Sequence, residues 1–321
     1  MLLDHCYCPY ICTILKYVHH FANIAKQILI MFTLIAIGYL FFKKNMITIQ
    51  GSADMGKVLL YLVIPVVIVN SFWIERTQEK TMELLYSILL SIVAMGLSVL
   101  IGYLFFGKKD GISAFSSAFS NAGFIGIPLV TAAVGNEGAF FVAMMIVMIN
   151  ALQWTVGVYM ISKDKNAMSF KKILTNPIVI SVGIGLFVYF LNIPQPAIIT
   201  DLFSTIKGIN TALAMLVSGT YLAKSDLLKM LTRKNTYIVS FVRLLVIPLI
   251  ILGVFYVLPI GTLDIKLTLV IAAACPVGSN VAIFAQQYDK NYTEAVEHVC
   301  MSTLLCLFTL PLLVSIATMI L

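Results

Sequence analysis

The sequence predicts an all-α polytopic membrane protein, and three observations lead to this fold class. The first is composition, since the 321 residues are 60% hydrophobic and 11% charged, with a mean hydropathy of +1.00. About a quarter of the residues of a soluble domain are charged, so the solvent of this chain is the lipid bilayer. The other two observations are an alternation of basic loops and a matched pair of interrupted apolar segments. Together they predict ten transmembrane helices in two inverted five-helix repeats, with helices four and nine broken and crossing.

Ten apolar runs are long enough to cross about 30 Å of hydrocarbon. A leader, residues 1–22, precedes them; it lacks the order of a signal peptide, and we expect it to be poorly ordered. The expected spans are residues 23–42, 54–74, 83–106, 112–134, 138–161, 176–193, 199–222, 236–258, 265–287 and 293–318.

Basic residues alternate between the loops on the two sides of these spans. The loops after spans one, three, five, seven and nine contain thirteen Lys and Arg residues, whereas the loops on the opposite side contain three. Because basic loops stay in the cytoplasm, we predict a multi-pass protein of the cell membrane with both termini outside. The basic residues are scattered among short loops, which argues against nucleic acid as a partner.

The ten spans divide into two sets of five, residues 23–161 and 176–321, joined by a basic cytoplasmic linker at 162–175. An odd number of spans makes the second set enter the membrane from the opposite side. The fourth span of each set contains residues that interrupt helical hydrogen bonding, namely Gly123, Gly126 and Pro128 in one set and Pro276 and Gly278 in the other. Paired interruptions at corresponding positions are typical of the binding sites of transporters with inverted repeats.

Polar, uncharged side chains lie beside both interruptions. A broken helix leaves free N–H groups with partial positive charge, and two such ends hold a small anion without any charged side chain. The alternative is that the same side chains only bond neighbouring helices. The candidate substrate-binding residues are Ser120, Asn121, Asn150, Gln153, Ser279 and Asn280.

Charged residues within the spans are few. We expect Arg243 and Lys207 to extend toward the headgroups rather than to bind a substrate. Glu294, Glu297 and His298 open span ten, where acidic residues complement the helix dipole, so we expect no metal site there and no cofactor elsewhere.

The residues at the two interruptions carry a resemblance to a known family. The segments Asn121–Leu129, Cys275–Asn280 and Phe284–Tyr288 resemble the auxin efflux carrier family, which includes plant PIN-type carriers and bacterial permeases, some linked to malate. The likeness extends from about Gln27 to the C-terminus.

This resemblance implies a scaffold of spans one, two, six and seven, and a mobile transport domain of the other six. It further implies that the protein moves a small organic anion, such as malate or an auxin-like carboxylate, by alternating access. Asn121, Gln153, Pro276 and Gly278 match residues of the family's site. We also expect a homodimer through the scaffold helices.

Three positions depart from the plant carriers. Ser120 stands in place of a proline, Val277 in place of a glutamine, and Ile68 in place of a serine that contacts substrate. Indole acetate is therefore not assumed as the substrate.

Two other classes of function were weighed. An intramembrane enzyme needs nucleophiles or paired acids within its spans, and the usual motifs are absent from the sequence. A receptor of unknown ligand needs an odd number of spans or a soluble output domain, whereas the longest loop between spans is short. The sequence therefore favours a transporter.

Overall fold

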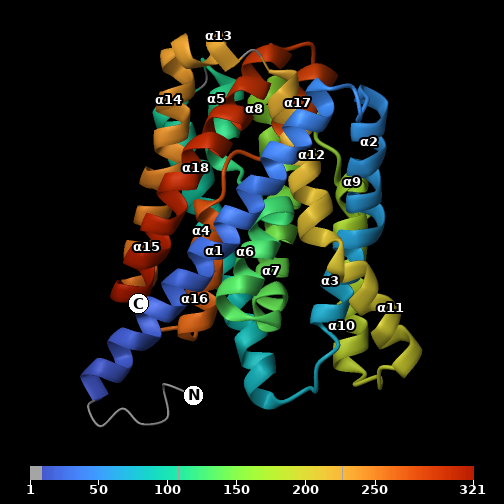
Figure 1. Cartoon of the computed structure of the whole chain (residues 1–321), viewed down its shortest axis with the longest axis vertical. Helices are drawn as coiled ribbons and strands as arrows, with labels where there is room; N and C mark the ends of the chain where they lie inside the picture. The colour runs from blue at the N-terminus through green and yellow to red at the C-terminus, as the bar shows by residue number, and fades with distance from the viewer. Residues whose placement is uncertain (1–8, 108, 226) are drawn as a thin grey trace.

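The computed structural model describes residues 9–107, 109–225 and 227–321, which form helices and turns without a β-strand (Figure 1). Residues 1–8 of the leader lie outside the described residues. The first half of the chain contains α1 (Pro9–Lys43), α2 (Ile49–Val58), η1 (Leu59–Val63), α3 (Ile64–Ser71), α4 (Gln78–Phe106), α5 (Gly111–Ala118), η2 (Ala122–Gly126), α6 (Ile127–Val134), α7 (Asn136–Leu152), η3 (Gln153–Gly157) and α8 (Val158–Ser162). The second half contains η4 (Lys165–Ala167), α9 (Phe170–Leu174), α10 (Pro177–Phe190), α11 (Ala197–Gly208), α12 (Asn210–Lys224), α13 (Leu227–Thr232), α14 (Lys234–Phe241), η5 (Val242–Val246), α15 (Ile247–Val257), α16 (Leu263–Ala274), α17 (Asn280–Gln287) and α18 (Tyr292–Ile320).

Most of the apolar runs form helices that can cross a membrane. Within the described residues, seven are long and apolar enough, and the bent pair Lys165–Leu174 with Pro177–Phe190 makes an eighth. The two remaining expected spans, 112–134 and 265–287, are divided into short helices because each is interrupted in its interior. The all-helical membrane fold is therefore confirmed, and the number ten stays a prediction.

The π turns η1, η2 and η5 each end directly before an Ile-Pro pair, at Ile64-Pro65, Ile127-Pro128 and Ile247-Pro248. A proline cannot donate to the carbonyl four residues earlier, and its ring pushes that carbonyl away. The wider turn removes the conflict, because the isoleucine N–H bonds five residues back instead. Pro128 is thus accommodated inside a helix.

The two interruptions meet in the interior of the protein. Helix α5 ends at Ala118 and α16 at Ala274, and Ser120 and Val277 then pair as an isolated antiparallel bridge. The Asn121 N–H donates to the Pro276 carbonyl at 2.8 Å, and the Gly278 N–H donates to the Phe119 carbonyl at 2.9 Å. Each extended segment thereby satisfies backbone groups that water cannot reach.

The predicted helix-breaking residues lie at different places relative to these interruptions. Pro276 and Gly278 are in the extended segment between α16 and α17. The first interruption comes at 119–121, just before Gly123, so Gly123 and Gly126 lie in the π turn η2 and Pro128 lies in the first turn of α6.

Close helix packing depends on small residues. A Cβ on Gly38 of α1 would lie 2.4 Å from the Leu216 carbonyl oxygen of α12, and one on Gly219 would lie 2.1 Å from the Ile35 carbonyl oxygen. Backbones that approach this closely maximise van der Waals contact, which substitutes for the hydrophobic effect in lipid. Helices α1 and α12 therefore form one tightly joined pair.

The expectation that Arg243 extends toward the headgroups is wrong. The side chain is 1% exposed, and its guanidinium points into the protein, where it bonds backbone carbonyls. Those carbonyls lie at helix ends that the sequence does not place near Arg243. Lys207, in contrast, is only partly buried, and its ammonium donates to the Asn136 side chain at 2.6 Å.

Candidate functional site

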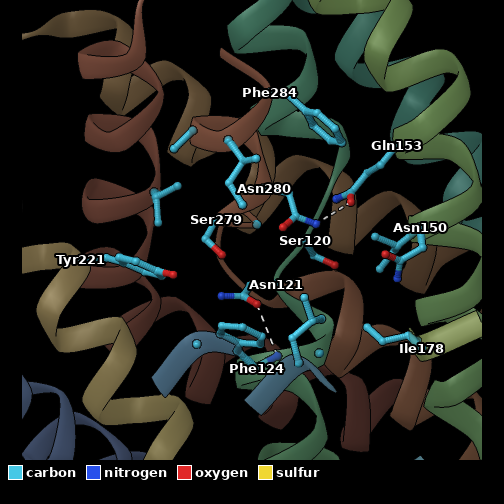
Figure 2. Close-up of a pocket in the computed structure, with 18 of the residues that line it drawn as sticks. Ser120, Asn121, Phe124, Asn150, Gln153, Ile178, Tyr221, Ser279, Asn280 and Phe284 are labelled. Atoms are coloured by element: carbon cyan, nitrogen blue, oxygen red, sulfur yellow. Dashed lines mark hydrogen bonds between the residues drawn. The ribbon is translucent and has the colours of Figure 1, made fainter. Parts of the chain in front are cut away.

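A cavity of about 500 Å³ lies where the two interruptions face α2, α10 and α12 (Figure 2). Its size falls within the range of small-molecule sites, roughly 300–1,000 Å³. Figure 2 shows Ser120, Asn121, Ser279 and Asn280 near the middle, with Tyr221 on one side and Asn150 and Gln153 on the other. The polar groups that converge here include Ser120, Asn121, Asn150, Gln153, Asn176, Tyr221, Lys224, Ser279, Asn280 and Gln286.

The first interruption presents Ser120 and Asn121 to the cavity. The Asn121 side-chain oxygen accepts from the Phe124 N–H at 3.3 Å and thereby caps the helical segment that begins at Ala122. The Ser120 hydroxyl is buried and has no hydrogen-bond partner among the described residues. A buried hydroxyl without a partner is costly, so Ser120 keeps unused hydrogen-bonding capacity beside the cavity.

The second interruption presents the start of α17. Ser279 occupies the N-cap position of this helix, and no side chain caps it. The Val281 and Ala282 N–H groups donate to the Gly278 and Ser279 carbonyls, each at 3.2 Å. The partial positive charge at the helix start, next to Asn280, lies at the cavity wall without an acidic side chain in the lining.

Gln153 joins the second interruption to span five. It is 1% exposed at the start of η3, and its side-chain oxygen accepts from the Asn280 side-chain nitrogen at 2.8 Å. The π turn ends with a bond from the Val158 N–H to the Gln153 carbonyl, which shifts the helix register at this point. This contact fixes both amides beside the cavity.

Asn150 is held by its neighbours rather than left free. Its nitrogen donates to the Ile146 carbonyl at 2.8 Å, and its oxygen accepts from the Asn176 nitrogen at 3.1 Å. Asn176 in turn caps α10 through the Ile178 N–H. Asn150 thus connects α7 to the start of α10 at the edge of the cavity.

The charges on the cavity wall are positive. No Asp or Glu is among its lining residues, whereas Lys57 and Lys224 are. Lys57 is paired with Asp54 at 2.9 Å and is exposed, so its charge is largely compensated. Lys224 is half-buried; its ammonium lies 5.2 Å from the Tyr221 ring centre and forms no ion pair with any residue that the structure describes.

All six candidate substrate-binding residues line this one cavity, although they come from three separate stretches of the sequence. Gly123 and Gly278 also line it, whereas Gly126, Pro128 and Pro276 do not. Sequence reasoning missed Tyr221 and Lys224, because Lys224 was counted only as a basic loop residue. A lysine at the last turn of an apolar helix carries no local signal that it faces a cavity.

Glu294, Glu297 and His298, near the start of α18, each contact a different partner. The Arg233 guanidinium pairs with Glu297 at 3.1 Å, the Asn235 amide donates to Glu294 at 3.0 Å, and His298 Nδ1 lies 3.0 Å from the Ser116 hydroxyl. Among the described residues, no three His, Cys, Asp or Glu side chains are grouped as a metal site requires.

Comparison with known proteins gives a family and two distant relatives. A family model described as "Membrane transport protein" matches residues 23–314. An "Uncharacterized transporter" of Methanothermobacter thermautotrophicus is 23% identical over 301 residues, covering 91% of this chain and 98% of the relative. A "Putative malonate transporter" of Rhizobium meliloti is 26% identical over 308 residues, covering 90% of this chain and 94% of the relative.

Proposed function

Since the chain belongs to the membrane transport protein family, the auxin efflux carrier family that its motifs resemble, we propose that it is a secondary transporter of a small organic anion. The family and the names of the relatives point to transport rather than enzymatic catalysis. The observation that carries the proposal is the convergence of two helix N-terminal ends on one cavity.

The chemistry of the cavity wall favours an anion over a cation or a neutral solute. The starts of η2 and α17 supply N–H groups and partial positive charge, and Lys224 adds a full charge. A carboxylate on the wall would bind a cation, and the lining residues include none. The six polar candidates then act as neutral donors and acceptors that orient the substrate.

The substrate class is a small mono- or dicarboxylate. One relative is named as a malonate transporter, and the family resemblance includes permeases linked to malate. Ser120, with its unpartnered hydroxyl, stands where plant carriers have a proline, which distinguishes this site from one for indole acetate.

We further propose that transport proceeds by alternating access in a ten-span protein with two inverted repeats. The cavity lies between the expected scaffold, α1 to α3 with α10 to α12, and the expected transport domain that contains both interruptions. Its wall extends to Lys57, Lys224 and Tyr292, which adjoin the basic loops expected in the cytoplasm.

At the other end, contacts between the two groups of helices close the path. The Tyr189 hydroxyl lies 3.0 Å from the Thr81 hydroxyl, and the Phe140 ring packs against Phe72 and Tyr189. This arrangement corresponds to an inward-facing state. Helix α1 begins, and α18 ends, at the end of the molecule away from α13, in keeping with both termini outside (Figure 1).

The test is transport of labelled malonate, malate and indole acetate into and out of proteoliposomes. We expect at least one of these anions to move in the wild type, and Asn121→Ala and Gln153→Ala to raise its KM by roughly tenfold, the effect of one or two lost hydrogen bonds to a charged group. Asn166→Ala changes an exposed amide in the linker and serves as the matched control. Equal transport by the wild type and both cavity variants would contradict the site.

A further inference from the structure

Arg243 is a buried cation that the proposed binding of substrate does not use. It lies in the π turn η5, is 1% exposed, and is not among the residues that line the cavity. Burying a charge is costly unless hydrogen bonds and opposite charge compensate it. The contacts of this guanidinium therefore indicate what it does.

Its hydrogen bonds reach the ends of two helices that are far apart in sequence. One nitrogen donates to the Ser117 carbonyl at 2.9 Å and to the Ala118 carbonyl at 3.0 Å, both in the last turn of α5. The other terminal nitrogen donates to the Ala273 carbonyl, in the last turn of α16. Carbonyls in the last turn of a helix have no partner within the helix, so Arg243 satisfies orphan acceptors at both interruptions.

The electrostatic balance explains why no carboxylate is needed. A helix C-terminal end is equivalent to about half a negative charge, so the ends of α5 and α16 together offset one guanidinium. In the part of the chain that the structure describes, Arg243 bonds only these carbonyls. The N-terminal ends of the half-helices that follow, η2 and α17, then face the cavity with no carboxylate among its lining residues to offset their partial positive charge.

We infer that Arg243 is a positioning residue that joins the two interruptions into one unit and neutralises the negative ends of their half-helices, so that only the positive ends act on the anion. One guanidinium serves both interruptions. Arg243 lies in the third expected span of the second repeat, and the corresponding span of the first repeat, α4, contains no arginine. The inference rests on the proposed function for its effect on the anion, whereas the joining of the interruptions is independent of any substrate.

The test compares Arg243→Gln, which removes the charge and most donors, with Arg243→Lys, which keeps the charge. Arg76→Gln is the matched control, because Arg76 also donates to a carbonyl, that of Phe190, but is exposed. The first measurement is amide hydrogen exchange at residues 119–121 and 277–278 in the purified protein. We expect Arg243→Gln to accelerate exchange at both segments together by roughly tenfold or more, the effect of losing bonds to a charged donor. Arg243→Lys should accelerate exchange less at both.

The second measurement is the KM for the transported anion in proteoliposomes. We expect a roughly tenfold or larger increase for Arg243→Gln and a smaller one for Arg243→Lys, whose charge is retained. Exchange that is unchanged, faster at one interruption only, or faster uniformly over the whole protein would overturn the inference. So would an unchanged KM in Arg243→Gln.

Two further outcomes are decided by the same design. If Arg243→Gln does not fold, Arg243→Lys alone decides, since exchange faster than wild type at both interruptions supports the inference and wild-type exchange refutes it. If the wild type moves no anion, the proposed function fails, and the exchange measurement still decides whether Arg243 joins the interruptions.

Discussion

Lys224 supplies the cavity with a positive charge, whereas the other polar side chains of the wall supply hydrogen-bonding groups. In the proposed function, the amides and hydroxyls of the wall would orient a substrate at short range, whereas a lysine without an ion pair among the described residues would attract any anion within several ångströms. It lies at the last turn of α12, a helix of the expected scaffold, on another wall of the cavity from the interruptions. A substrate with two carboxylates would be held from both sides.

We predict that Lys224→Met raises the KM for a dicarboxylate by roughly three- to tenfold, because a half-buried charge interaction is partly screened by water. The KM for a monocarboxylate should rise less. The measurement is concentration-dependent uptake of malonate and of a monocarboxylate at constant ionic strength. Lys57→Met is the matched control, since Lys57 lines the same cavity but is paired with Asp54. Equal effects of the two substitutions would contradict a specific role for Lys224.

The backbone segments of the two interruptions lie very close together at Gly278. A Cβ on Gly278 would lie 3.3 Å from the carbonyl oxygens of Phe119 and Ser120, which is closer than most such contacts. Both oxygens belong to the backbone of the facing segment, so the bridge can relieve the contact only by moving apart. The absence of a side chain at Gly278 therefore allows the two segments to approach this closely.

Gly278→Ala should destabilise the protein by about 1–3 kcal/mol, the usual cost of forcing an extra carbon into a packed interior. It should also weaken anion binding, since the start of α17 moves with the bridge. The measurements are thermal unfolding in detergent and uptake in proteoliposomes. Gly183→Ala, within α10 with open space around its Cβ position, should leave stability unchanged or increase it slightly. A Gly278→Ala protein that unfolds and transports as the wild type does would exclude this account.

The molecule as a whole is asymmetric between its two ends. The cavity extends to residues beside the basic loops, whereas the opposite end is closed by contacts of α10 and α3 with α4 and α7. Under the proposed alternating access, these contacts would separate when the opposite end opens. The bond between Tyr189 and Thr81 is one that a single substitution removes cleanly.

We predict that Tyr189→Phe shifts the population toward an outward-open state by roughly fivefold, because it removes one hydrogen bond worth about 1 kcal/mol and keeps the ring. The measurement is the rate at which an impermeant thiol reagent labels a cysteine introduced at Ser71, which is buried near the closed end. Tyr237→Phe removes a hydroxyl that donates to the Leu231 carbonyl elsewhere and is the control. Labelling that is no faster in Tyr189→Phe than in the control would rule out this closure.

Local properties of the sequence were enough for the class of fold and for much of the candidate site. Hydropathy depends on composition within a window, and proline and glycine act on their own turn of helix, so the apolar spans and the two interrupted ones could be located from the sequence. Ser120, Asn121, Ser279 and Asn280 were predicted because they adjoin those interruptions. Gln153 and Asn150 were predicted because polar amides within an apolar span are costly unless they bond something.

Contacts between distant segments could be decided only by the tertiary structure. The first interruption falls at 119–121 because the π turn η2 accommodates Pro128 and Pro276 accepts the Asn121 N–H from across the bridge. Arg243 points inward because two helix ends converge beside it, and Lys224 faces the cavity because α12 packs on α1. The sequence by itself therefore determined a membrane-spanning chain with two interrupted spans and their neighbouring polar residues. Tertiary packing determined which side chains share one cavity, since partners more than a hundred residues apart leave no signal in either local segment.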